Sequence, residues 1–205
     1  MKLTNRWNRF IYRLWAPVYD LIFDLPYRQG RHLSMAALAI RPGERALFVG
    51  IGTGLDLPDL QVGIVAVGLD LSRPMLARAQ SKLPLPGRAV SLVQGDAQAL
   101  PFRDGVFDAA VLNLIVSVAP DGARCFRESM RVVRRGGRAS VFDKFLAPGQ
   151  SPGRLRRLLS VFTTLAGTDF NRRFEDIAPP GGYVIVRDEA SLLRGMYRVI
   201  LLRRL

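Results

Sequence analysis

The chain has one cysteine and one histidine among its 205 residues, and few acidic residues for its size. Cys125, as the single cysteine, cannot form an intramolecular disulfide, and we expect a small buried side chain within a helix. The longest charge-free stretch, Ala109 to Pro120, is too short to cross a bilayer. Charges interrupt the apolar residues of the basic amino terminus, so it lacks the apolar centre of a signal peptide. We expect a cytoplasmic chain with one main domain.

Basic residues outnumber acidic ones by 30 to 17, giving a formal net charge of +13 that is mostly arginine. Such an excess indicates a polyanionic partner, either nucleic acid or a membrane that carries anionic lipids. No RNA-binding module is recognisable, and the basic residues share faces with bulky apolar ones, which favours the membrane. GC-rich coding also enriches arginine, so the charge alone does not identify the partner.

The first thirty residues have a pattern of their own. Apolar side chains recur there at helical spacing, while basic and polar ones fall largely on the other side. A basic amphipathic helix with tryptophan in its apolar face is typical of a segment lying in a membrane interface, but it also fits a helix packed over an active site. We therefore expect residues 1–30 to form an amphipathic cap and residues 31–205 the main domain. The apolar positions are Leu3, Trp7, Phe10, Ile11, Leu14 and Val18, and the others are Lys2, Asn5, Arg6, Arg9 and Arg13.

Beyond Gly43, apolar strand patterns alternate with helical ones, which predicts an α/β fold with a mainly parallel sheet covered on both faces. A final pair of apolar segments, Tyr183–Val186 and Tyr197–Leu202, predicts an antiparallel end to this sheet. A loop at Pro148–Gly153 and a second basic amphipathic helix at Arg154–Ala166 precede that pair. The other expected strands are 45–49, 64–70, 89–94, 107–116 and 137–145, and the expected helices are 55–60, 73–83 and 121–134.

Three glycines at alternate positions follow the first of these strands, in the segment Val49–Gly54. An apolar strand, a glycine turn and an acid at the end of the next strand, here Asp70, describe the first β-α-β unit of a nucleotide-binding fold. The Gly-x-Gly-x-Gly spacing, with Gly68–Ser72 and Gly95–Ala97 at the expected intervals, resembles class I S-adenosylmethionine-dependent methyltransferases. That resemblance implies a Rossmann-like fold.

The same resemblance implies a cofactor site without a metal. S-Adenosylmethionine would bind there and leave as S-adenosylhomocysteine. Asp70 would hold the ribose hydroxyls, and the amino terminus of the next helix would face the methionine carboxylate. One departure is Phe48, where members usually carry an acidic residue that contacts the methionine end through water. The implied cofactor contacts are Gly50, Gly52, Thr53, Gly54, Asp70, Leu71, Asp96 and Ala97, the last two at the adenine, with Asn113 and Leu114 between cofactor and substrate.

Further motifs point to one group of these enzymes. Trp15–Asp20, Gly30-Arg31, Gly52–Pro58 and Ser117–Asp121 resemble bacterial phospholipid N-methyltransferases, and the likeness extends to about Phe145. Those enzymes convert phosphatidylethanolamine stepwise to phosphatidylcholine, which implies a peripheral protein on the inner face of the cell membrane. Enzymes that C-methylate quinone precursors share several of these motifs and remain an alternative. A methyltransferase-like membrane adaptor without activity is another, supported by the departure at Phe48.

The substrate side of the site follows from the N-methylation hypothesis. Tyr19, and with it Tyr12 and Trp15, would present aromatic faces to the methylated ammonium. Arg31 would hold a lipid phosphate, and His32 would take the proton of the amine. Lys144, after the fifth strand, would border the substrate pocket. Ordinary packing, or a surface ion pair for Lys144, is the alternative role of each of these residues.

Overall fold

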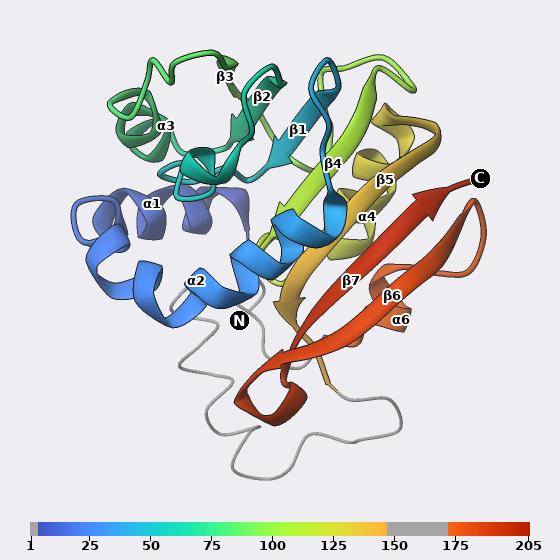
Figure 1. The fold of residues 1–205 in the computed structure, drawn as a ribbon. Coiled ribbons are helices and arrows are strands. Elements are labelled where there is room, and N and C mark those ends of the chain that lie inside the picture. Colours follow the sequence, from blue (N-terminus) through green and yellow to red (C-terminus); the bar gives the residue numbers. More distant parts are fainter. Residues whose placement is uncertain (1–3, 147–171) are drawn as a thin grey trace, which may run out of the picture.

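A computed structural model describes residues 4–146 and 172–205. Seven strands form one sheet in the order β3-β2-β1-β4-β5-β7-β6, with helices on both faces (Figure 1). The expected α/β fold is confirmed. The strands are β1 Arg45–Val49, β2 Val65–Asp70, β3 Ala89–Gln94, β4 Phe107–Asn113, β5 Val133–Lys144, β6 Tyr183–Leu192 and β7 Tyr197–Arg204. The α-helices are α1 Asn5–Trp15, α2 Tyr19–Leu38, α3 Arg73–Gln80, α4 Gly122–Val132 and α6 Phe174–Ile177, and two 3-10 turns are η1 Leu57–Asp59 and η2 Leu193–Gly195.

The first five strands run parallel, and β7 and β6 close the sheet antiparallel. Parallel strands buried on both faces need apolar side chains in both directions. In β1, Ala46 and Phe48 pack into one apolar cluster, while Leu47 and Val49 pack into another on the opposite face. The continuous apolar run before the glycine loop therefore fills two separate halves of the core.

The carboxyl ends of β1, β2 and β4 lie at the same edge of the sheet, and the amino-terminal helices lie across it (Figure 1). On one face α2 packs on β4, β5 and β7, while α4 packs on β4 and β5 together with α6. Cys125 of α4 is buried as expected, and burial raises the pKa of its thiol to about 12. Among the described residues, no helix is long and apolar enough to cross a membrane.

Several element boundaries differ from the sequence prediction. The helix expected at 55–60 is only the 3-10 turn Leu57–Asp59. The strand expected to reach Val116 ends at Asn113, where Leu114 takes a left-handed conformation with φ 57°. The strand β5 starts directly after α4, and β6 continues to Leu192 because it pairs along the length of β7. The expected loop at 148–153 and helix at 154–166 lie outside the described residues.

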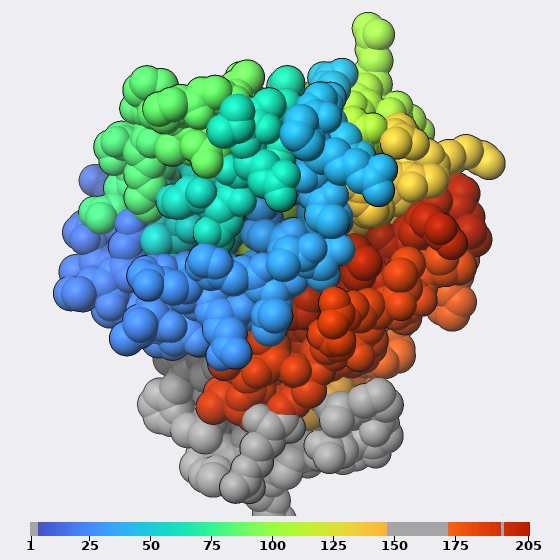
Figure 2. Space-filling view, viewed as in Figure 1, coloured from blue at the N-terminus to red at the C-terminus, as the bar shows by residue number. Residues whose placement is uncertain are grey.

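The helix α2 continues from Tyr19 to Leu38, so it crosses the boundary expected between residues 30 and 31. Gly30 lies where the helix meets β5, and a Cβ atom added there would fall 2.1 Å from Cζ of Phe142. The missing side chain lets this helix approach the sheet closely. In Figure 2 the amino-terminal residues, in blue, form one continuous surface with the rest of the molecule, between the green and red parts. A division of the chain at residue 30 therefore has no counterpart in the secondary structure.

Candidate active site

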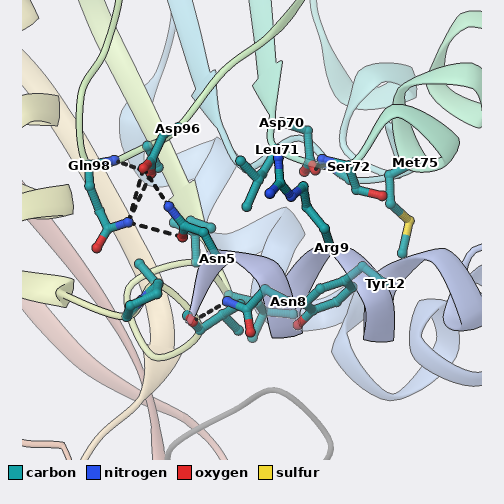
Figure 3. Close-up of a pocket in the computed structure, with 18 of the residues that line it drawn as sticks. Asn5, Asn8, Arg9, Tyr12, Asp70, Leu71, Ser72, Met75, Asp96 and Gln98 are labelled. Atoms are coloured by element: carbon teal, nitrogen blue, oxygen red, sulfur yellow. Dashed lines mark hydrogen bonds between the residues drawn. The ribbon is translucent and has the colours of Figure 1, made fainter. Parts of the chain in front are cut away.

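A cavity opens at the carboxyl ends of β1, β2 and β4, with α1 along one side (Figure 3). Open α/β sheets bind ligands at this edge. Its lining comes from α1, the start of α2, the glycine loop, the turn after β2 with α3, the loop after β3, and the end of β4 with the segment that follows. The lining includes Asn5, Asn8, Arg9, Tyr12, Tyr19, Gly50, Gly52, Asp70, Leu71, Ser72, Met75, Asp96, Ala97, Gln98, Asn113 and Leu114.

The glycine loop presents bare backbone to this cavity. Gly50 and Gly52 have φ values of +71° and +58°, in a backbone region that residues with a side chain rarely adopt. A Cβ atom on Gly52 would meet no other atom within 4 Å. No α-helix follows the loop, so the expected helix amino terminus for a carboxylate is wrong, and the short turn at Leu57–Asp59 takes its place. Gly54 also has a positive φ, but it does not line the cavity.

Asp70 fixes the loop to the end of β2. Its carboxylate accepts hydrogen bonds from the backbone N–H groups of Gly52 and Ser72, both at 2.8 Å. Burial raises the pKa of Asp70, against the opposing effect of these N–H bonds. A carboxylate accepts about four hydrogen bonds, so this one retains acceptor capacity on its cavity side. The position and the free capacity fit a pair of ribose hydroxyls.

Asp96 lies at the other end of the cavity, on the loop after β3 (Figure 3). It accepts a 2.9 Å hydrogen bond from the backbone N–H of Gln98 and further ones from the amides of Gln98 and Asn5, the latter at 2.6 Å. Burial opposes the charge of this carboxylate, but these bonds outweigh it and lower the pKa of Asp96. The adjacent Ala97 also lines the cavity.

Asn5, Asn8 and Arg9 of α1 also line the cavity, a role that the sequence prediction missed. Asn8 is buried and donates a 2.9 Å hydrogen bond to the carbonyl oxygen of Val118. Asn5, Asn8 and Tyr12 lie along the side of the helix that faces the cavity, and the side chain of Arg9 extends toward Leu71 (Figure 3). Spacings of three and four residues place Asn5, Asn8 and Tyr12 on one side of a helix, but they do not indicate that this side docks.

The apolar side of α1 lies partly outside. Phe10 and Leu14 are exposed, as is Val18 in the turn that follows. The helix lies along the cavity, as expected of a helix packed over an active site, but its buried residue is the polar Asn8. Arg9, assigned to the basic side, lines the cavity instead. Leu3 and Lys2 lie outside the described residues.

A row of aromatic rings leads away from the cavity. Tyr12 lies 6.3 Å from Tyr19, and Tyr19 lies 4.7 Å from Phe23, as measured between ring centroids. Burial raises the pKa of both tyrosines. Trp15 packs edge-on against Phe23 at 5.5 Å and lines neither this cavity nor the one beside it, whereas Tyr19 lines both. Of the three aromatic residues expected at the substrate, the structure brings Tyr12 and Tyr19 to the cavity.

A polar latch holds the start of α2 to the glycine loop. The hydroxyl of Thr53 donates to Asp20, and Lys82 Nζ donates to Asp20 at 2.8 Å and to the carbonyl oxygen of Thr53 at 2.7 Å. Arg78 of α3 adds a 3.1 Å hydrogen bond to the carbonyl oxygen of Pro17. Thr53 therefore acts mainly in joining two elements, although it also lines the neighbouring cavity.

Two neighbours on α2, Arg31 and His32, point to different places. The Arg31 side chain is buried and pairs with Asp24 and Asp56. Arg31 lines the cavity beside the first one and is held by two carboxylates, so it is not the exposed anchor for lipid phosphate that the sequence suggested. His32 is exposed, lies 3.5 Å from Asp59 and lines a separate hollow. The structure does not bring it to the cavity, and its predicted role as a base has no geometric support.

Lys144 also lies apart from the cavity. Its side chain is buried, 3.9 Å from Asp143 and 5.9 Å from the ring centroid of Tyr197. It lines neither of the two adjoining cavities. Asn113 and Leu114 line both, and their place between cofactor and substrate stays a prediction. No group of three or more histidine, cysteine, aspartate or glutamate side chains suited to a metal occurs in residues 4–146 and 172–205.

The amino-acid sequence is similar to that of known methyltransferases. Residues 47–141 match the family described as a methyltransferase domain. Over 136 residues the chain is 38% identical to a phosphatidylethanolamine N-methyltransferase from Cereibacter sphaeroides, covering 65% of this chain and 66% of that protein. It is 36% identical over 139 residues to a demethylmenaquinone methyltransferase from Beutenbergia cavernae, covering 65% of this chain and 56% of the relative. The alignments thus span about two thirds of the first relative and little over half of the second.

Solved structures agree on the fold. A chain from the complex between the Haloferax volcanii Trm112 methyltransferase activator and a methyltransferase superposes with a TM-score of 0.78. The two chains are 16% identical, and the match covers 96% of each. The bare glycine loop, the carboxylate after β2 and the open cavity at this edge fit S-adenosylmethionine. Residues 47–141 therefore match a methyltransferase domain, and the chain has the Rossmann-like fold of methyltransferases.

Proposed function

We propose that the protein transfers methyl groups from S-adenosylmethionine to the amine of phosphatidylethanolamine and of its methylated intermediates, toward phosphatidylcholine. The reaction would take place at the anionic inner surface of the cell membrane. The phosphatidylethanolamine N-methyltransferase of Cereibacter sphaeroides supports this substrate. The observation that carries the proposal is the aromatic row at the cavity, with Tyr19 between its two compartments.

The cofactor would lie across the carboxyl edge of the sheet. Asp70 would accept hydrogen bonds from the ribose, Leu71 would pack on the adenine, and Asp96 with the N–H of Ala97 would bind the adenine edge. For this, the adenine amine has to share Asp96 with Asn5, which already donates to it. When bound, S-adenosylmethionine supplies an electrophilic methyl group. Phe48 is buried in the apolar core and takes no part.

Tyr19 would guide the substrate amine. An aromatic face attracts a methylated ammonium by roughly 1 to 2 kcal/mol when water is excluded. Burial raises the pKa of Tyr19, so its hydroxyl stays protonated at neutral pH and serves as a hydrogen-bonding group, not as a base. The attacking amine has to be neutral and in line with the methyl group, so positioning supplies most of the acceleration. We assign no general base, because His32 lies outside the cavity.

The surface beside the cavity suits a lipid bilayer. Leu21 and Leu25 of α2 are 86% and 77% exposed, and Phe10 and Leu14 of α1 are exposed nearby in the chain. Protruding apolar side chains on helices of a strongly basic protein are typical of a surface that lies in a membrane interface. Exposed arginines, Arg6 and Arg13 among them, lie on α1.

C-methylation of a quinone precursor is the second candidate, supported by the demethylmenaquinone methyltransferase of Beutenbergia cavernae. A flat ring would pack on the same aromatic row, so the structure favours neither substrate by shape. A methyltransferase-like membrane adaptor without activity is the third candidate. Asp70 and Asp96 both lie in the cavity in bonded positions, which argues for retained cofactor binding and against this third candidate.

We expect S-adenosylhomocysteine to bind the isolated protein, and Asp70→Ala to weaken binding by about 1.5 to 3 kcal/mol, because two ribose hydroxyls lose a charged acceptor. Isothermal titration calorimetry measures this. Asp59→Ala is the matched control, since Asp59 contacts His32 outside the cavity and should leave the affinity unchanged. Equal affinities for wild type and Asp70→Ala would remove Asp70 from the site.

We also expect the protein to bind anionic vesicles better than neutral ones. The double variant Arg6→Gln/Arg13→Gln should weaken this binding by about fivefold per charge. Raising salt from 0.1 M to 1 M should weaken it further, because the screening length falls from about 10 Å to about 3 Å. Flotation assays compare these cases, with Arg41→Gln/Arg103→Gln as a control of equal charge away from α1. Vesicle binding that changes neither with salt nor with the Arg6→Gln/Arg13→Gln variant would contradict a role for the membrane.

With vesicles of phosphatidylethanolamine and S-adenosylmethionine, lipid mass spectrometry should show mono-, di- and trimethylated head groups. Tyr19→Phe keeps the ring and should retain most activity, whereas Tyr19→Ala should slow the later methylations most, because their products carry the bulkier ammonium. Methylation of a quinone precursor with none of the phospholipid would overturn the proposed substrate and leave the fold and cofactor standing.

A further inference from the structure

A second cavity adjoins the first at the glycine loop. The two share Tyr19, Gly50, Gly52, Asn113 and Leu114, so one ligand can extend from one compartment into the other. The second compartment begins at the loop, on the side where Asp56 and Arg31 stand. It contains charged groups that have no role in the reaction proposed above.

These charged groups are a buried pair, Arg31 and Asp56. Their side chains are 6% and 12% exposed, and Arg31 Nε lies 2.9 Å from Asp56 Oδ1. The two atoms are not aligned as a hydrogen bond, and among the described residues neither has another hydrogen-bond partner. Asn113 Nδ2 donates to the other oxygen, Asp56 Oδ2, at 3.0 Å. Arg31 and Asp56 therefore form a buried ion pair in the lining of this compartment, and the two atoms that contact each other have no further hydrogen-bond partner among the described residues.

Leaving charged groups buried without full hydrogen bonding is costly. Burial raises the pKa of Asp56, and the charge of Arg31 offsets only part of that effect. A ligand that supplies both a cation and an anion would satisfy the pair. The amino-acid end of S-adenosylmethionine is such a group, because its ammonium and carboxylate stand on one carbon atom.

The expected orientation of the bound cofactor places its amino-acid end in the second compartment. If Asp96 holds the adenine and Asp70 the ribose, the rest of the molecule passes the bare backbone of Gly52 and reaches the second compartment. The strand before the loop offers no acid to the ammonium, because Phe48 and Val49 are apolar and buried. Asp56 is the carboxylate among the residues that line the second compartment.

We propose that Asp56 binds the ammonium of S-adenosylmethionine and that Arg31 binds its carboxylate, with Asn113 and Asp24 holding the two side chains in place. This inference rests on the cofactor placement given above, and it deepens that placement by assigning the methionine end. It also gives Arg31 a role different from holding lipid phosphate. Binding exchanges one imperfect internal ion pair for two contacts with the ligand.

Calorimetry with two ligands tests this. S-Adenosylhomocysteine has the amino-acid end, and 5′-methylthioadenosine keeps the adenine, ribose and sulfur but lacks it. Asp56→Asn should weaken S-adenosylhomocysteine binding by at least about tenfold, since tenfold corresponds to about 1.4 kcal/mol and a hydrogen bond to a charged group contributes about that much or more. Affinity for 5′-methylthioadenosine should stay within twofold, which also shows that the variant is folded.

Arg31→Gln should give the same selective loss, and Asp59→Asn, in the turn after Asp56, should leave both affinities unchanged. An equal loss for both ligands, or an unchanged affinity of Asp56→Asn for S-adenosylhomocysteine, would overturn the assignment of Asp56. If the wild-type protein binds neither ligand, the cofactor placement itself is wrong. That failure is thereby distinguished from failure of the Asp56 assignment.

Discussion

Two amide side chains join α1 to the loops at the carboxyl edge of the sheet, where the helix forms one side of the cavity. Asn5 donates to Asp96, and Asn8 donates to the carbonyl oxygen of Val118. Breaking a buried hydrogen bond so that one partner remains unsatisfied costs about 1 to 3 kcal/mol. The helix is therefore fixed by its polar side, which leaves its apolar side free to face outward. A helix docked by its apolar side would have covered the same edge without forming a polar cavity.

The other features follow from this docking. The latch of Asp20, Thr53 and Lys82 joins the start of α2 to the glycine loop, so the turn between the two helices is fixed at the cavity. Tyr12 and Tyr19 then meet at the boundary of the two compartments. The exposed Leu21 and Leu25 are left on the same hairpin that forms the wall of the site. A membrane contact on this hairpin would thus lie next to the cavity.

The sequence predicted those parts that depend on the order of strands. Asp70 and Asp96 follow apolar strands, and parallel strands bring their carboxyl ends to one edge, so both reach the cavity. The docking of α1 could not be predicted in the same way. An amphipathic pattern identifies two sides of a helix but not the one that packs on the domain. The ion pairs of Arg31 join residues far apart in the chain, and they are visible only in the folded structure.

The position of His32 shows a second limit of prediction from the sequence. A single histidine next to Arg31 was a reasonable candidate for a base, but adjacent residues on a helix point in directions about 100° apart. Arg31 faces the protein, and His32 consequently faces Asp59 and solvent. The segment after the glycine loop also departs from the expected helix, since only Leu57–Asp59 are helical there.

Hydrogen exchange of the backbone amides, followed by mass spectrometry, tests most directly whether α1 is part of the cofactor site. With S-adenosylhomocysteine added, exchange should slow in Asn5–Trp15 as well as in the turn after β2 that contains Asp70, because the ligand contacts both. Slower exchange in that turn with no change in α1 would contradict the central claim. The cofactor would then bind on the sheet without the helix that forms the cavity wall.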